Sequence, residues 1–168
     1  MQVEMKVKNL AFDLSKSGAM VFLEEINGDR ILPIWIGIFE ANAIALELRK
    51  ISTARPMTHD LILDIIKGLK AEVTKIVVTE LKDNTFYAAI HMNTKEGKVV
   101  VDSRPSDAIA VALRVGTTIY VVEEVINQAG RSEKTKGDDK TEGKTEDKTE
   151  EFMEWLEKLD PDDFKYKM

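Results

Sequence analysis

The sequence contains no cysteine and only two histidines, His59 and His91. The absence of cysteine excludes disulfide bonds, thiolate metal ligands and a cysteine nucleophile. With only two imidazoles, a structural zinc site is not expected, and a bound metal ion would be held mainly by carboxylates. A Lys- and Glu-rich composition without cysteine is also typical of thermophilic proteins.

A long apolar run is missing as well. No stretch approaches the roughly 18 residues that a membrane-spanning helix needs. The opening residues, MQVEMKVKNL, place charges where a secretory signal peptide has its apolar region. We therefore expect a cytoplasmic protein without a membrane segment.

Positively charged residues are fewer than negatively charged ones. The chain has 24 Lys and Arg against 30 Asp and Glu, which gives a net charge of −6. Residues 1–128 carry 15 and 17 of these, a balance of −2, whereas residues 129–168 carry 9 and 13, a balance of −4. These values argue against a broad nucleic-acid-binding surface, but the nearly neutral first part leaves room for a local basic patch.

Alternating apolar residues predict two groups of strands. The first group covers residues 3–12, 19–26 and 31–36, with an Asn-Gly hairpin turn before its last member. The second group lies between residues 72 and 102, and a final strand is expected over residues 117–126.

Three main helices are expected between these strands. They begin near Ile38, at Thr58, which is the expected N-cap, and at Pro105. The resulting order βββααβββαβ separates runs of strands from helices, so it predicts an α+β fold with a mixed, mostly antiparallel sheet.

The composition changes after residue 128. We expect one domain over residues 1–128, followed by a disordered charged linker over residues 129–151, which has almost no apolar residue. Residues 152–168 contain the short amphipathic segment EFMEWLEKLDPDDF, which predicts a C-terminal helix. Such a short helix needs a partner, which is its own domain, a second subunit or another protein.

Two acids and a histidine are candidates for chemistry. Glu40 and Glu47 fall between the two apolar sides of the first helix, where they form either a solvated stripe or partly buried carboxylates. His59 follows the expected cap of the second helix and is either a packed boundary residue or a general acid or base. His91, in a predicted strand, has less support.

Arg55 and Arg104 each precede a proline at a helix start. An arginine at such a position can bind a phosphate together with exposed backbone amides. Asp60 and Asp107 lie in the same first turns, so each arginine can instead pair with an acid. Since the domain has two such arginines, we expect a shared anion site near His59 and Glu40.

No glycine-rich phosphate loop, nucleophile elbow, paired-histidine zinc helix or calcium loop is present. Instead, the segments LPIWIGIFEANAIALEL, RPMTHDLILDII and DSRPSDAIAVALR, with FYAAIHM between the last two, resemble the bifunctional nuclease domain family in content and order. The resemblance covers about residues 3–126. It implies a nuclease that cleaves both RNA and DNA with little sequence preference.

The resemblance suggests roles for the candidate residues. In a metal-assisted hydrolysis, Mg²⁺ or Mn²⁺ is held by carboxylates from Glu40, Asp60 or Asp107. His59 moves a proton, with Glu40 and Asp107 as further catalytic groups, and Arg55 and Arg104 bind the phosphate.

Two other functions stay open from the residues alone. One is a non-enzymatic homo-oligomer, a homodimer or larger, in which alanine-rich helices form subunit contacts and the tail helix binds a partner. The other is a binding module for a small anionic ligand at the Arg-Pro helix starts.

Overall fold

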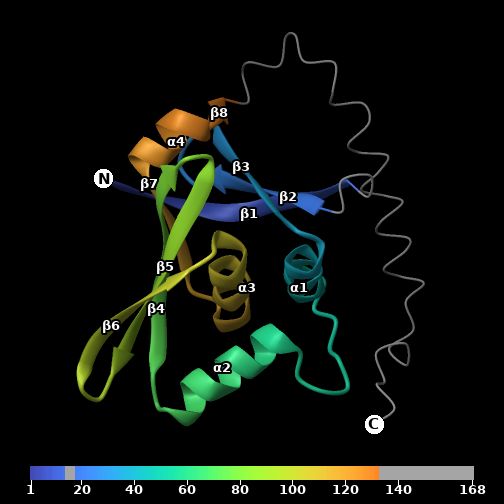
Figure 1. Ribbon diagram of the computed structural model, residues 1–168, viewed down its shortest axis with the longest axis vertical. Coiled ribbons are helices and arrows are strands. Elements are labelled where there is room, and N and C mark those ends of the chain that lie inside the picture. The colour runs from blue at the N-terminus through green and yellow to red at the C-terminus, as the bar shows by residue number, and fades with distance from the viewer. Residues whose placement is uncertain (14–17, 133–168) are drawn as a thin grey trace.

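The computed structural model describes residues 1–13 and 18–132 (Figure 1). The expected linker from residue 133 onward and the expected C-terminal helix lie outside these residues. The elements follow one another in the order β1 (Gln2–Asp13), β2 (Gly18–Glu25), β3 (Arg30–Gly37), α1 (Ile38–Leu48), α2 (Thr58–Gly68), β4 (Glu72–Lys82), β5 (Thr85–Thr94), β6 (Gly97–Ser103), α3 (Pro105–Val115), β7 (Thr118–Val122), α4 (Glu123–Ala129) and β8 (Arg131–Ser132).

The strands of the described residues join one sheet, in the order β6-β5-β4-β7-β1-β2-β3-β8. β4 and β7 pair in parallel, and the other neighbouring strands pair antiparallel. The sheet therefore consists of two antiparallel meanders, β1-β2-β3 and β4-β5-β6, joined through β7. The predicted α+β class with a mixed, mostly antiparallel sheet is confirmed.

Helix α3 occupies the centre of the domain. It packs against both α1 and α2 and against β4, β5 and β7 (Figure 1). Residues 108–112 of this helix, the sequence AIAVA, are all buried, and the small side chains of the three alanines let the helix lie close to its neighbours. The alanines expected to form subunit contacts are therefore buried within the domain.

The end of the described chain differs from the prediction. The strand expected over residues 117–126 ends at Val122, and residues 123–129 form helix α4. Val125 and Ile126 are buried on one side of this helix, so they contribute to the core from a helix instead of a strand. The linker expected from residue 129 begins later, because Ala129 belongs to α4 and residues 131–132 pair with β3 as β8.

The expected N-cap of α2 is also corrected. The N-cap of α2 is Met57 and not Thr58, because the carboxylate of Asp60 accepts a hydrogen bond from the Met57 backbone N–H and closes the first turn. In α1 Phe39 is 84% exposed, whereas Leu46, on the same apolar side, is buried.

No helix in the described residues is long and apolar enough to cross a membrane.

Candidate active site

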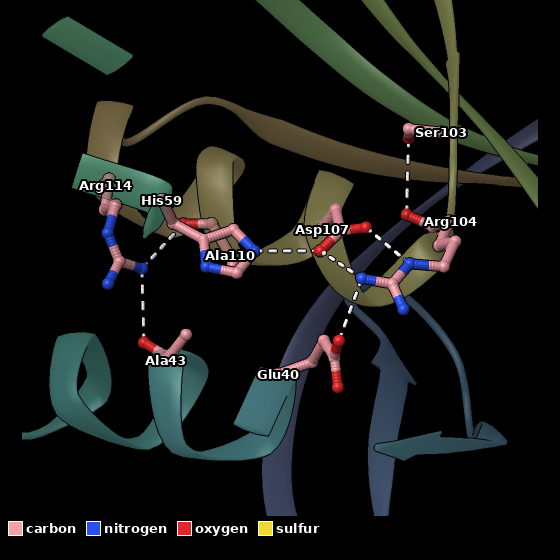
Figure 2. Close-up of polar contacts among 8 residues, drawn as sticks. All are labelled: Glu40, Ala43, His59, Ser103, Arg104, Asp107, Ala110 and Arg114. Atoms are coloured by element: carbon pink, nitrogen blue, oxygen red, sulfur yellow. Dashed lines mark hydrogen bonds and ion pairs between the residues drawn. The ribbon is translucent and has the colours of Figure 1, made fainter. Parts of the chain in front are cut away.

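The first turns of α2 and α3 meet through a histidine and an aspartate (Figure 2). His59 Nε2 lies 2.9 Å from Asp107 Oδ1. The His59 side chain is 8% exposed and that of Asp107 is 22% exposed. His59, predicted at the edge of an apolar face, is therefore buried, with its imidazole held by a carboxylate.

Arg104 extends this contact to a third helix. As the N-cap of α3, it donates from Nε to Asp107 Oδ2 at 2.7 Å and from Nη2 to Asp107 Oδ1 at 3.1 Å. The same Nη2 donates to Glu40 Oε1 at 2.8 Å. The Arg104 side chain remains 65% exposed, so its guanidinium is accessible from solvent while it joins the two carboxylates.

Glu40, His59, Arg104 and Asp107 therefore form one connected group, called the acid–histidine–arginine cluster below. Each residue lies in the first turn of a helix or caps it: Glu40 in α1, His59 in α2, and the other two in α3. The positive ends of three helix dipoles thus point toward the same small region. This region favours negative charge, which the two carboxylates supply in the present arrangement.

Gly37 allows Glu40 to take its position. A side chain at Gly37, the N-cap of α1, would collide with the Glu40 carboxylate. The carboxylate therefore folds back over the backbone at the start of α1, where Arg104 reaches it.

A second ion pair lies beside the cluster. Arg114 Nε donates to Asp60 Oδ1 at 2.6 Å. Figure 2 shows its other contacts, in which Nη1 donates to the carbonyls of Ala43 and Ala110 at 3.1 and 3.0 Å. The Arg114 side chain is only 5% exposed. Arg114 therefore links α1, α2 and α3. Two helical turns apart on α3, Asp107 and Arg114 bind His59 and Asp60, and these two contacts hold the start of α2 against α3.

Arg55 lies apart from the cluster. It is exposed in the connection between α1 and α2 and lines a pocket of about 300 Å³ together with Asp60 and Arg114. In the part of the chain that the structure describes, its guanidinium forms no ion pair. Two hydroxyl residues, Ser52 and Thr53, also line this pocket. The two arginines expected in one anion site therefore flank α2 at different places.

The remaining candidates have other partners. Glu47 pairs with Lys50 near the end of α1. His91 lies on β5, away from the cluster, and its pKa is lowered by burial and by the nearby charge of Lys75.

The three carboxylates expected to hold a metal ion do not fit that role as arranged. Asp60 is occupied by Arg114 and the Met57 N–H, whereas Glu40 and Asp107 share Arg104. Among residues 1–13 and 18–132, no group of three or more His, Asp or Glu side chains is placed to hold a metal ion. A divalent ion would have to displace Arg104 to reach the two carboxylates of the cluster.

Comparison with known proteins identifies the domain. A family model described as the bifunctional nuclease domain matches residues 21–134. The chain belongs to the bifunctional nuclease domain family. Uncharacterized proteins from two strains of Mycobacterium tuberculosis are each 42% identical to it over 163 residues, which cover 96% of this chain and 98% of theirs. The rice protein named Bifunctional nuclease 1 (Oryza sativa) is 24% identical over 121 residues, or 70% of this chain and 37% of the rice protein.

In this bifunctional nuclease domain, the cluster keeps Asp107 ionised. Burial raises the pKa of Asp107, but hydrogen bonds from Arg104 and His59 outweigh it, so the pKa lies below the ordinary aspartate value. For Arg104, the hydrogen bond to Asp107 is the largest influence and raises its pKa further. The pKa of Asp60 is also lowered, because the hydrogen bonds from Arg114 and Met57 outweigh burial.

Asp107→Asn is expected to lower the free energy of unfolding by about 1.5 kcal/mol at neutral pH, since the three hydrogen bonds to the Asp107 carboxylate, two from Arg104 and one from His59, are weakened. A carboxylate with a lowered pKa stabilises the fold above its unfolded pKa of about 3.9, and this contribution is lost as the pH falls through the folded pKa. The difference between the wild type and the variant should therefore shrink below about pH 4. Urea unfolding at a series of pH values measures it.

Asp64→Asn, at an exposed site on α2, is the matched control for Asp107→Asn and should change stability little at any pH. A wild-type advantage over Asp107→Asn that stays constant from neutral to acidic pH would contradict the assigned ion pairs.

Proposed function

We propose that this protein hydrolyses phosphodiester bonds of RNA and DNA with little sequence preference, using the acid–histidine–arginine cluster. Its family membership supports the class of reaction, and the name of the rice relative is consistent with it. The observation that carries the proposal is the continuous set of hydrogen bonds from His59 through Asp107 and Arg104 to Glu40 at three converging helix starts.

In this proposal, Arg104 contacts the phosphate of the substrate. Its side chain is largely exposed, and Nη1 makes no hydrogen bond to another described residue, so one edge of the guanidinium can donate to a phosphate oxygen. The helix N-termini add to the attraction of negative charge. Charge that accumulates on the phosphate oxygens in the transition state would be stabilised by these donors.

The two proton transfers are assigned to the other members of the cluster. Glu40 accepts a proton from the attacking water, and the new P–O bond forms from the water oxygen. His59, held by Asp107, gives a proton to the leaving oxygen as the old P–O bond breaks. Exchange of one proton with solvent at each residue then restores the starting state.

This scheme assigns no step to a metal ion, because the carboxylates of Glu40, Asp60 and Asp107 are each bound by an arginine. The low overall positive charge fits a small local site better than an extended nucleic-acid groove, and binding should therefore depend on few phosphate contacts.

The test is an assay of the full chain on single-stranded RNA and single-stranded DNA, with EDTA, Mg²⁺ or Mn²⁺. We expect cleavage of both nucleic acids at many positions, and we expect it to persist in EDTA. If EDTA abolished the activity and Mg²⁺ or Mn²⁺ restored it, the ion would instead replace Arg104 between the carboxylates of Glu40 and Asp107. A protein that cleaves neither nucleic acid under any of these conditions would refute the proposal.

We propose a non-enzymatic module that binds a small anionic ligand as the second candidate function. The observation that favours it is the pocket lined by Arg55, whose guanidinium has no acidic partner in the described part of the chain. The same assay separates the two functions. A protein that cleaves nothing, but whose melting temperature rises with added phosphate, would favour the second.

A further inference from the structure

Strand β6 forms one edge of the sheet (Figure 1). Its inner side pairs with β5 along its whole length, from Gly97 opposite Thr94 to Ser103 opposite Ala88. No strand among the described residues pairs with its outer side. An open edge of this kind presents free backbone N–H and C=O groups that can pair with another chain.

Three adjacent valines make this edge apolar. Val99, Val100 and Val101 are 39%, 58% and 41% exposed. Because side chains alternate along a strand, Val100 lies on one face of the sheet and the other two lie on the opposite face. Exposed β-branched residues on both faces of an open edge are unfavourable in water, and natural edge strands usually carry a central charge or a proline to prevent pairing.

The charges of β6 flank these valines symmetrically. The strand reads Gly-Lys-Val-Val-Val-Asp-Ser, with Lys98 two residues before Val100 and Asp102 two residues after it. Both are exposed, and neither forms an ion pair with another described residue. If two copies of β6 pair antiparallel about Val100, Lys98 of each copy lies directly opposite Asp102 of the other, on the same face of the sheet.

We propose that the protein forms a homodimer by antiparallel pairing of two β6 strands about a twofold axis at Val100. The pairing is self-complementary, as a twofold interface requires. It places Lys98 opposite Asp102 on both sides of the axis and the two copies of Val100 opposite each other at the centre. A shift by one residue would remove both charge matches, so the register is defined. This surface would supply the homodimer that the sequence led us to expect, and it uses a strand instead of the alanine-rich helices.

The dimer would bring the two clusters near each other. Ser103 ends β6, and the next residue is Arg104 of the cluster. At about 3.3 Å per residue along a strand, Arg104 lies roughly 13 Å from the axis in each copy. The proposed pairing does not depend on the nuclease proposal, because it rests on β6 alone.

The test is the dimer dissociation constant of the full chain, measured by sedimentation velocity over a range of concentrations. Lys98→Asp places two like-charged pairs across the axis and should raise this constant about five- to thirtyfold. The exchange variant Lys98→Asp/Asp102→Lys restores opposite charges at both positions, and its constant should return to within about twofold of the wild-type value. Lys95→Asp, the same charge change in the turn before β6, is the control and should leave the constant unchanged.

A wild-type protein that remains monomeric throughout would overturn the proposal. It would also be overturned by a Lys98→Asp protein that dimerises like the wild type, or by an exchange variant as weak as Lys98→Asp. Thermal unfolding of each variant at a concentration well below its dimer dissociation constant, where all the proteins are monomeric, should match the wild type and confirms that the folded protein is being compared.

Discussion

Arg114→Met should lower the free energy of unfolding by about 2 to 4 kcal/mol. Removal of one member of a buried ion pair typically costs 3 to 5 kcal/mol, and we expect the lower part of the range because the Asp60 side chain is 35% exposed. The variant loses the donor to Asp60 and the donors to two backbone carbonyls, Ala43 on α1 and Ala110 on α3. The methionine retains most of the apolar contact of the stem.

Urea unfolding measures this change as a shift of the midpoint at constant slope. Arg55→Met is the control, because this arginine lines the same pocket but is exposed and forms no ion pair with a described residue, and it should change stability by less than about 0.5 kcal/mol. If Arg114→Met unfolded at the same urea concentration as the wild type, the role of Arg114 in fastening the three helices would be wrong.

His59→Gln should reduce the rate of RNA cleavage by about 100- to 10,000-fold, because a glutamine cannot donate a proton to the leaving oxygen. The amide can still hydrogen-bond to Asp107, so the first turns of α2 and α3 should stay together. Initial rates on a labelled single-stranded RNA, at equal concentrations of protein with wild-type melting behaviour, measure the effect.

His91→Gln is the matched control, since His91 lies on β5 outside the cluster, and its rate should equal that of the wild type. Loss of activity in both histidine variants to the same degree would point to damaged folding instead of a catalytic role for His59.

Local sequence patterns were sufficient for much of the fold. The Arg-Pro-Ser-Asp segment at residues 104–107 predicted a helix start, and α3 does begin at Pro105. The same segment suggested that Arg104 could pair with Asp107, three residues later, and the two side chains do form a hydrogen bond. The prediction was wrong at α4, where the valines from Val121 to Val125 resemble a strand but the chain forms a helix from Glu123. Packing of Val125 and Ile126 against the sheet favours the helix there, and this packing is not visible in local propensity.

The candidate site depended on contacts between distant residues. The bond from Arg104 to Glu40 joins residues 64 positions apart, and that from His59 to Asp107 joins residues 48 apart. The sequence suggested that these side chains could meet, but their distances follow only from how α1 and α2 pack on α3. Arg114 was missed because an arginine in the last turn of a helix is usually a solvated charge; its burial is a property of the packed domain.

The central claim is that His59, Asp107, Arg104 and Glu40 act as one catalytic unit. The most direct measurement is the rate of RNA cleavage by the double variant His59→Gln/Arg104→Gln beside the two single variants and the wild type. Groups that act together lose most of their effect with the first substitution, so the double variant should be no more than about tenfold slower than the slower single variant. A single variant, at either position, that cleaves RNA as fast as the wild type would contradict the claim.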